Sequence, residues 1–370
     1  MLKLGFGLMR LPRINDSYEN IDKELFKKMI DEFILSGGTY FDTAWVYHGG
    51  NSELAVKECL IDRYDRSKFT LADKMPMFAV KEESDLEKYF NKQLEKTQAG
   101  YFDYYLLHAL NKKTYDLSEQ VHAFDFIKKK KEEGLIKHIG FSFHDSSLVL
   151  EEILKKHPEI EFVQLQINYL DWESPSVESK NCYNLCEKYN KEVVVMEPVK
   201  GGALFNIPSE AEELFTNYHK DLSKASWAIR YAASLKNVMM VLSGMSNFEQ
   251  MKDNLSYMKD FKPLTKEEYS IIDQVVAKIK SVITVDCTGC RYCITEQHCP
   301  KDILIPDLFT VYNGAKNYTH PSPSKAYNEL TKSSNHGSAG DCLKCGACEK
   351  HCPQHLDIRK YLSDIKLYFE

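Results

Sequence analysis

Residues 39–47, TYFDTAWVY, decide the fold of this chain. The stretch begins with the β-branched and aromatic residues typical of a short strand, and Asp42 and Tyr47 stand where that strand ends. Two later stretches have the same design, because FTLADK ends on Lys74 and DYYLLH ends on His108. Four polar residues of complementary chemistry thus occupy the ends of three strands, which is where an α/β barrel carries its catalytic groups.

Outside this region, short apolar stretches alternate with amphipathic segments. The apolar stretches are LGFGLMRL, TYFDTA, FTLADK, DYYLLH, HIGFS, FVQLQ, VVVMEP and NVMMVLSG. The segments with helical periodicity cover residues 22–36, 52–62, 84–97, 118–133, 147–157, 179–189 and 223–235. Parallel strands that are buried on both faces read as continuous apolar runs, so this alternation predicts a (β/α)8 TIM barrel. The alternative is a doubly wound open sheet, but no G-x-G-x-x-G motif follows the first strand.

The character of the sequence changes near residue 260. We expect a barrel over residues 1–260, a lysine-rich helical connector over 261–283 and a small cysteine-rich domain over 284–370. That last part contains two motifs, each of three cysteines followed by a Cys-Pro. Their cysteines are Cys287, Cys290, Cys293 and Cys299 in the first motif, and Cys342, Cys345, Cys348 and Cys352 in the second.

The spacing of these cysteines indicates iron-sulfur clusters. Cysteines three residues apart let one turning segment present three thiolates to a 4Fe-4S cube, while the fourth ligand comes from elsewhere. Structural zinc is the alternative, because C-x2-C pairs also suit tetrahedral zinc, but the triplet-plus-one arrangement favours 4Fe-4S. The other three cysteines, Cys59, Cys182 and Cys186, lie in predicted helices and are interpreted as apolar packing residues.

Composition excludes several classes of protein. A net charge of -6 with no large basic patch makes nucleic acid an unexpected partner. Residues 1–13 carry no targeting pattern and no apolar run approaches the ~18 residues of a membrane span, so we predict a cytoplasmic protein with no membrane partner. Eleven cysteines in such a protein favour metal binding over disulfides.

The order and approximate spacing of Asp42, Tyr47, Lys74 and His108 resemble the catalytic tetrad of the aldo-keto reductases. The resemblance implies an NAD(P)-dependent oxidoreductase that reduces a carbonyl, or oxidises an alcohol, at the barrel mouth. Tyr47 would donate the proton and His108 would place the substrate oxygen. An unperturbed tyrosine titrates near ~10, so Lys74, oriented by Asp42, would lower the pKa of Tyr47.

The same resemblance implies a site for NADP(H) or NAD(H) at the later strand ends. The nicotinamide carboxamide would contact Ser142 and Gln164. The pyrophosphate loop would comprise Glu197, Pro198, Val199, Gly201 and Gly202, and the adenosine end would contact Ser243, Gly244, Met245, Ser246, Gln250 and Asn254. Backbone amides in such small-residue loops and at helix N-termini can hold phosphate groups.

This chain departs from the family pattern at three points in the cofactor site. Phe143 stands where the family has asparagine, and no aromatic residue lies near Met196 to stack on the nicotinamide. Met245 and Gln250 replace the basic residues that hold a 2'-phosphate. The preference between NADP and NAD therefore stays open.

A barrel followed by a two-cluster 4Fe-4S ferredoxin-type domain is similar to the iron-sulfur branch of the aldo-keto reductases. By the ferredoxin pattern, Cys299 would complete the second cluster and Cys352 the first. The branch implies two 4Fe-4S clusters that relay electrons, a small carbonyl or alcohol substrate, and an external electron carrier such as ferredoxin or flavodoxin as a further partner. Two alternatives stay open: an electron-transfer protein with little reductase activity, and a reductase whose clusters are purely structural.

Overall fold

The computed structural model describes residues 2–15, 17–175, 177–281, 284–295, 299–316, 322–334 and 336–370. By their internal contacts the residues form two units. The first contains Met1–Pro198 and Ala225–Leu264, and the second contains Val199–Lys224 and Thr265–Glu370. This division differs from the expected bounds, and the boundary after the barrel falls at Leu264. The second unit includes not only the rest of the connector but also residues 199–224, which interrupt the barrel sequence between two of its strands.

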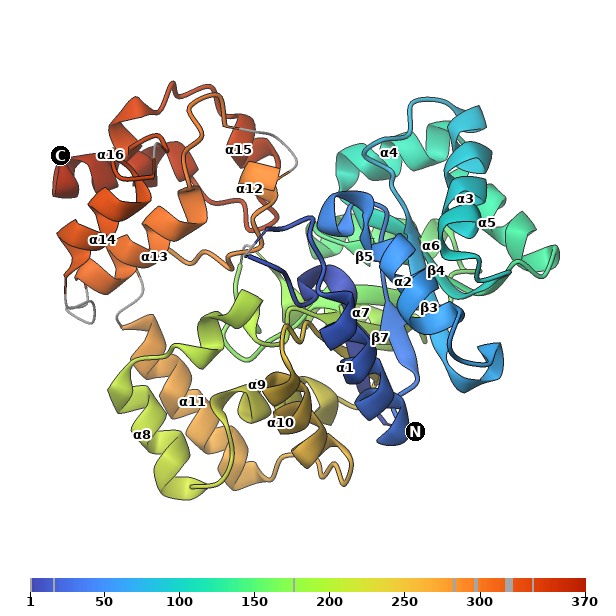
Figure 1. The fold of residues 1–370 in the computed structure, drawn as a ribbon, viewed down its shortest axis with the longest axis horizontal. Helices are drawn as coiled ribbons and strands as arrows, with labels where there is room; N and C mark the ends of the chain where they lie inside the picture. The colour runs from blue at the N-terminus through green and yellow to red at the C-terminus, as the bar shows by residue number, and fades with distance from the viewer. Residues whose placement is uncertain are drawn as a thin grey trace. The chain divides into compact units, whose positions relative to one another are not determined.

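Eight strands of the first unit pair in parallel in chain order and close into a barrel, in which β1 pairs with β8. The predicted (β/α)8 fold is therefore confirmed, and the helices of this unit lie around the strands (Figure 1). The strands are β1 (Leu4–Gly7), β2 (Tyr40–Asp42), β3 (Thr70–Met75), β4 (Phe102–Leu110), β5 (Ile136–Phe143), β6 (Phe162–Gln166), β7 (Glu192–Met196) and β8 (Val238–Ser243).

The barrel helices follow the predicted segments closely. They are α1 (Lys23–Leu35), α2 (Ser52–Val56), α3 (Glu83–Thr97), α4 (Lys112–Gln120), α5 (Ala123–Glu132), α6 (Ser147–Lys156), α7 (Ser179–Lys188), α9 (Lys224–Ser234) and α10 (Phe248–Met258). A π-helical turn, Lys57–Ile61, extends α2. The single helix expected over residues 118–133 is instead the end of α4 followed by α5, because His122 between them adopts a left-handed φ of 55°.

The barrel interior explains why the polar residues at the strand ends converge. A layer of apolar side chains fills the interior, formed by Tyr40, Ala72, Leu106, Phe162, Val194, Met240 and Leu242. Side chains alternate along a strand, so the residue two positions later points into the same interior, one layer nearer the carboxyl end. In β2 to β7 those residues are Asp42, Lys74, His108, Ser142, Gln164 and Met196. Three of the four tetrad residues, Asp42, Lys74 and His108, thus share one layer with the predicted nicotinamide residues Ser142 and Gln164.

Glycine makes room for the large residues of the apolar layer. A Cβ placed on Gly140 would lie 2.5 Å from the backbone oxygen of Phe162 and 2.7 Å from its ring. A Cβ on Gly5 would lie 2.7 Å from Leu242. Interiors packed this closely do not accept added methyl groups without strain, so both glycines are required by close approach.

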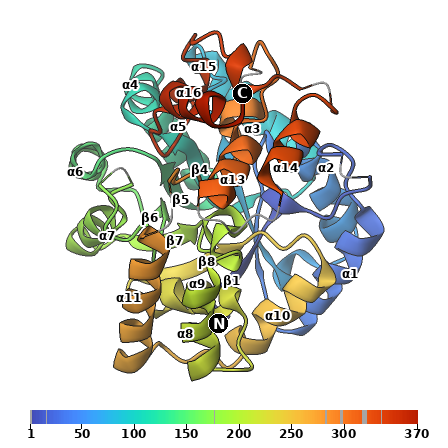
Figure 2. The same cartoon turned by 90° about the vertical axis from the view of Figure 1, so that its left-hand side faces the viewer.

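The second unit is helical and has its own core. Its helices are α8 (Ser209–Tyr218), α11 (Lys266–Lys280), α12 (Tyr292–Thr295), α13 (Ile305–Lys316), α14 (Pro323–Leu330), α15 (Ala347–Lys350) and α16 (Ile358–Phe369). Helices α8 and α11 pack side by side (Figure 2). Leu308, Phe309, Leu362 and Ile365 are fully buried in the core beneath the cysteine motifs. Across the residues described here, no helix is long and apolar enough to cross a membrane.

Candidate active site and metal centres

The structure brings the four predicted catalytic residues together. Asp42, Lys74 and His108 lie near the carboxyl ends of β2, β3 and β4, and Tyr47 opens the 3-10 turn Tyr47–Gly50. The Nζ atom of Lys74 lies 2.6 Å from Asp42 Oδ1 and 3.3 Å from the Tyr47 hydroxyl. The imidazole of His108 packs edge-on against the Tyr47 ring, with 6.2 Å between the centroids. All four side chains are buried.

Lys74 is the centre of this group. Its side chain is fully buried, and its ammonium also donates to the carbonyl oxygen of Thr43 at 2.7 Å. A buried ammonium costs several kcal/mol unless its charge is matched and its protons are bonded. Asp42 supplies the matching charge. Burial raises the pKa of Asp42, and the pairing with Lys74 opposes that rise.

Burial dominates the pKa of Tyr47. Its pKa is raised well above the usual value, first by burial and then by carboxylates that include Asp42. The lowering of this pKa that we expect from Lys74 stays a prediction, because burial dominates the net rise. The charge of Lys74 is already matched by Asp42, while full burial penalises the phenolate. Burial and Lys74 lower the pKa of His108 well below its usual value, so the site holds a protonated phenol beside a neutral imidazole.

A buried polar network behind Lys74 was missed by the sequence analysis. The amide nitrogen of Gln93, on α3, lies 2.9 Å from Asp73 Oδ1, 3.0 Å from Glu53 Oε1 and 3.0 Å from the Lys74 carbonyl oxygen. Asp73 Oδ1 also accepts the backbone N–H of Lys74 at 2.8 Å, and Tyr105 donates to Gln93 Oε1 at 2.5 Å. The network therefore fixes the backbone that carries Lys74. In the sequence, Asp73 inside FTLADK is the residue that indicates this network. Aspartate is depleted in strands, so an aspartate within one calls for buried partners.

Two of the predicted nicotinamide residues are neighbours in the barrel mouth. Ser142 and Gln164 pair in register across β5 and β6. The Ser142 hydroxyl accepts the backbone N–H of Ala109 at 2.7 Å. The buried Oε1 atom of Gln164 has no hydrogen-bond partner among the described residues. A carboxamide NH2 group is the kind of donor that this acceptor lacks, so the pair fits the group expected here.

Some of the residues predicted for the adenosine end form hydrogen bonds within the protein. The Asn254 amide donates to Ser243 Oγ at 2.8 Å and accepts from the Tyr257 hydroxyl at 2.5 Å, so it ties α10 to β8. The side-chain oxygen of Gln250 accepts the backbone N–H of Ser246 at 2.7 Å. These bonds shape the loop between β8 and α10.

Arg10 is a basic residue at this loop that the sequence analysis missed. A Cβ placed on Gly244 would lie 3.1 Å from the side chain of Arg10, so the arginine stem lies against the glycine backbone. The Ser246 hydroxyl donates to the Arg10 carbonyl oxygen at 2.9 Å. More than two hundred residues separate the two segments, and no local pattern reports their contact.

The predicted pyrophosphate loop crosses the boundary between the units. Glu197 and Pro198 end the first part of the barrel unit, whereas Val199, Gly201 and Gly202 belong to the second unit. Gly201 and Gly202 have φ values of 62° and 99°, which glycine adopts without strain. Within the second unit, Lys200 Nζ lies 2.9 Å from Asp286 Oδ1, the residue before the first cysteine motif.

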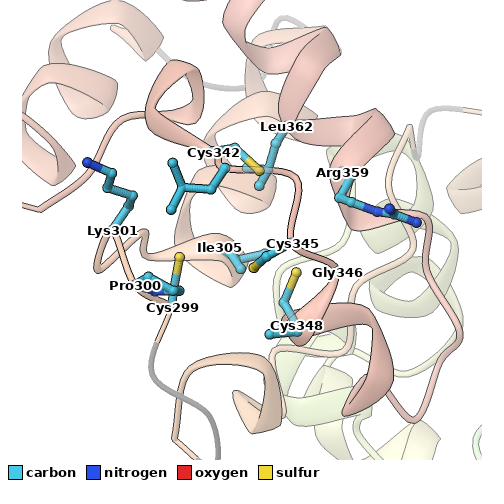
Figure 3. Close-up of a pocket in the computed structure, with 12 residues that line it drawn as sticks. Cys299, Pro300, Lys301, Ile305, Cys342, Cys345, Gly346, Cys348, Arg359 and Leu362 are labelled. Carbon is cyan, nitrogen blue, oxygen red and sulfur yellow. The ribbon is translucent and has the colours of Figure 1, made fainter.

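The eight motif cysteines line two cavities of the second unit. Cys299 joins Cys342, Cys345 and Cys348 around one cavity, which Figure 3 shows from close by. Cys352 joins Cys287, Cys290 and Cys293 around the other. Each motif thus contributes three cysteines to one cavity and one to the other. The exchange expected from the ferredoxin pattern is the arrangement that the structure has.

The two motifs also repeat the same backbone path. Left-handed residues occupy the second and fourth positions after the first cysteine, at Gly289 and Arg291 in one motif and at Lys344 and Gly346 in the other. Each motif uses glycine at only one of these positions, so the other residue is held there by the fold. The backbone N–H of the second position donates to the sulfur of the first cysteine at 3.4 Å in both motifs. Such bonds stabilise thiolate ligands.

The cavities fit clusters better than single ions. Among the residues that the structure describes, no group of three or more cysteine, histidine or acidic side chains is arranged to hold a single metal ion. Four sulfurs about 2.3 Å from one zinc ion would leave little space between them. Burial, followed by Glu349, raises the pKa of the Cys348 thiol to about 11. Grouped thiols of this kind lose their protons when a metal centre supplies positive charge.

The three cysteines outside the motifs behave as packing residues. Cys59, Cys182 and Cys186 are buried in the barrel unit. Burial raises the pKa of Cys59 to about 11 and that of Cys182 to about 12, so both remain neutral thiols.

The fold and these sites define an oxidoreductase that joins an α/β barrel to an iron-sulfur domain. The chain belongs to the aldo/keto reductase family, which it matches over residues 3–277. Residues 286–356 match the 4Fe-4S dicluster domain.

Several relatives share the barrel. YqkF of Bacillus subtilis (strain 168), named as an uncharacterized oxidoreductase, is 24% identical over 296 residues that cover 72% of this chain and 90% of that protein. The holo form of aldo-keto reductase AKR11C1 from Bacillus halodurans superposes with a TM-score of 0.60 at 24% identity, covering 74% of this chain and 91% of that one. An aldo-keto reductase from Klebsiella pneumoniae in complex with NADPH gives 0.59 at 18% identity, covering 74% and 90%.

The network behind Lys74 makes a prediction about pH. Burial, and then the nearby Glu53, raise the pKa of Asp73 well above its usual value. The folded state therefore keeps a proton that the unfolded chain releases above its own pKa of about 3.9, and the free energy of unfolding falls as pH rises toward the folded pKa. We expect Asp73→Asn to remove this part of the pH dependence.

The measurement is urea unfolding of the barrel at a series of pH values, followed by tryptophan fluorescence, since Trp45, Trp172 and Trp227 all lie in the first unit. The stability of the wild type relative to Asp73→Asn should decline as pH rises. Asp116→Asn, which changes an exposed acid on α4, is the control and should run parallel to the wild type. If the stability of Asp73→Asn changed with pH in parallel with that of the wild type, the raised pKa assigned to Asp73 would be contradicted.

Proposed function

We propose that this protein reduces a small carbonyl compound, or oxidises the corresponding alcohol, with a nicotinamide cofactor at the barrel mouth. The observation that carries the proposal is the position of Lys74 Nζ between Asp42, at 2.6 Å, and the Tyr47 hydroxyl, at 3.3 Å. A phenol that shares its oxygen with a fixed ammonium can release its proton and leave a stabilised phenolate. The bound nicotinamide supplies the hydride that adds to the carbonyl carbon.

Each residue has a distinct role in this reaction. Tyr47 donates its proton to the oxygen of the reacting carbonyl, and Lys74 then stabilises the phenolate. Asp42 keeps Lys74 charged and oriented. His108, as a neutral imidazole, donates a hydrogen bond that places the same oxygen. The raised pKa of Tyr47 does not prevent the transfer, because alkoxides are far stronger bases than phenolates, and water itself has a pKa of about 15.7.

We propose NADPH as the preferred cofactor. Ser142 and the unpartnered oxygen of Gln164 would hold the carboxamide, as argued above. The stem of the Arg10 side chain lies against Gly244, at the end of the site where the family holds a 2'-phosphate. Arg10 would take over from the basic residues that Met245 and Gln250 replace. The structural relative from Klebsiella pneumoniae that was solved with NADPH supports the same choice.

We further propose two 4Fe-4S clusters, one in each four-cysteine cavity, that relay electrons. A nicotinamide delivers two electrons as hydride, whereas a 4Fe-4S cluster exchanges one, so two clusters together match one nicotinamide. The alternative of an electron-transfer protein without reductase activity leaves the buried tetrad unexplained. The alternative of structural clusters agrees with the position of Cys293 and Cys348 in the core, and the cysteine variants below separate it from a relay.

Tyr47→Phe should lower carbonyl reduction by roughly 10²- to 10⁴-fold, because the variant lacks the proton donor. The measurement is NADPH oxidation with a panel of aldehydes under anaerobic conditions, together with the absorbance of the clusters, which should not change. Tyr189→Phe removes a hydroxyl at the end of α7, outside the barrel mouth, and should keep full activity. Normal turnover by Tyr47→Phe would show that another group donates the proton.

Cysteine variants test both the number of clusters and the exchange between motifs. Wild-type protein should contain about eight iron atoms, and Cys299→Ala should retain about four. Adding Cys345→Ala to Cys299→Ala should remove no further iron, because both line one cavity, whereas adding Cys290→Ala should remove the rest. Cys182→Ala is the control with full iron content. Zinc in place of iron would exclude clusters, and unchanged NADPH turnover in a folded Cys290→Ala protein would make them structural.

The relay is tested by adding NADPH to anaerobic protein without substrate and recording the electron paramagnetic resonance spectrum. A reduced-cluster signal is expected if nicotinamide electrons reach the clusters. Dithionite provides the positive control. No signal with NADPH, although dithionite reduces the clusters, would contradict a relay from the barrel cofactor.

A further inference from the structure

The two cysteine cavities differ in the exposure of their cysteines. Cys345, which lines one of them, is exposed, whereas the cysteines around the other cavity are buried or half-buried. The two residues before Cys345 are exposed as well, and Leu343 keeps 60% of its surface accessible. An exposed apolar side chain thus stands two residues before an exposed cysteine.

The charged side chains that line this cavity are basic, in a chain of net charge -6. Lys301 and Arg359 line it, and Figure 3 shows them on opposite sides of the cysteines. Lys344 adds an exposed cation next to Cys345. Among the described residues that line the cavity, none is acidic. Two acids lie nearby: Glu349 pairs with Arg359 at 2.7 Å, and the exposed Asp341 is close enough to Lys301 to interact with its charge. Lys301 and Lys344 are the other cations of this surface.

We propose that this surface, formed by Lys301, Leu343, Lys344 and Cys345 and here called the Cys345 face, docks a small acidic protein that carries single electrons. The proposal rests on the proposed clusters. The reduced carrier gives one electron to the cluster held by Cys299, Cys342, Cys345 and Cys348, which passes from the 2+ to the 1+ state, and the carrier is oxidised by one electron. No bond or proton changes place.

Charge and polarity select this partner. A basic rim attracts an acidic surface over the range of the Debye length and raises the rate of encounter, an effect that falls with salt. Leu343 supplies an apolar contact at the centre, as in other interfaces with a polar rim. The exposed ligand Cys345 shortens the path from the carrier to the cluster, which a site at the other cavity would not offer.

The test mixes the full-length protein, with oxidised clusters, and the hydroquinone of an acidic flavodoxin under anaerobic conditions. Stopped-flow absorbance follows the one-electron oxidation of the flavin to its semiquinone. The double variant Lys301→Glu/Lys344→Glu should slow the second-order step by about tenfold or more at low ionic strength. Wild-type protein should lose rate as salt rises, and the double variant should not.

Lys325→Glu is the matched control, since Lys325 is a well-exposed lysine on α14 of the same unit. It should react like the wild type, and all variants should keep their iron content and their signal after dithionite reduction. Equal rates for the double variant and the control at every salt concentration would overturn the proposal. The assay contains neither nicotinamide nor carbonyl compound, so its outcome is independent of whether the barrel reduces carbonyls.

Discussion

The buried ion pair of Lys74 and Asp42 is the interaction on which the barrel mouth depends. It places a full positive charge inside a closed sheet, where breaking a matched pair typically costs about 3–5 kcal/mol. The apolar layer beneath it supplies rigidity, and the network of Gln93 and Asp73 holds the backbone of Lys74 from behind. Because the charge is fixed in this way, the Tyr47 hydroxyl is presented to the mouth with a defined partner.

In the second unit, too, burial disfavours a charged group, which there is the thiolate of cysteine. Its thiols lie at the edge of an apolar core, where burial disfavours the thiolate form, as the raised pKa of Cys348 indicates. The two motifs meet this cost with the same backbone turns and the same amide-to-sulfur bonds. Exchange of the fourth cysteine then links the two halves of the unit, so each cavity depends on both motifs.

Two kinds of redox chemistry are thus combined in one chain. The barrel mouth is suited to moving a proton with a hydride, because it offers a phenol, an ammonium and a neutral imidazole. The cysteine cavities are suited to single electrons. The loop of Lys200 belongs by its contacts to the cysteine unit and pairs with Asp286, although it follows a barrel strand in sequence. The expected pyrophosphate loop is therefore divided between the two units.

Sequence alone determined the features that depend on local pattern. The ends of apolar stretches gave the eight strands and the positions of Asp42, Tyr47, Lys74 and His108, because strand period and barrel topology make such ends converge. The cysteine spacing likewise gave both motifs, and their resemblance to the ferredoxin pattern implied the exchange between them. These features need only a few consecutive residues to be read.

Tertiary structure decided what depends on burial and on contacts between distant segments. The raised pKa of Tyr47 follows from its complete burial, which no local pattern reports. Gln93 reaches Lys74 from a helix, Arg10 meets Gly244 across the closure of the barrel, and Asn254 is bound within the protein. Electrostatic balance and packing sum over neighbours in space, and for these residues the neighbours come from segments that only the closed barrel brings together.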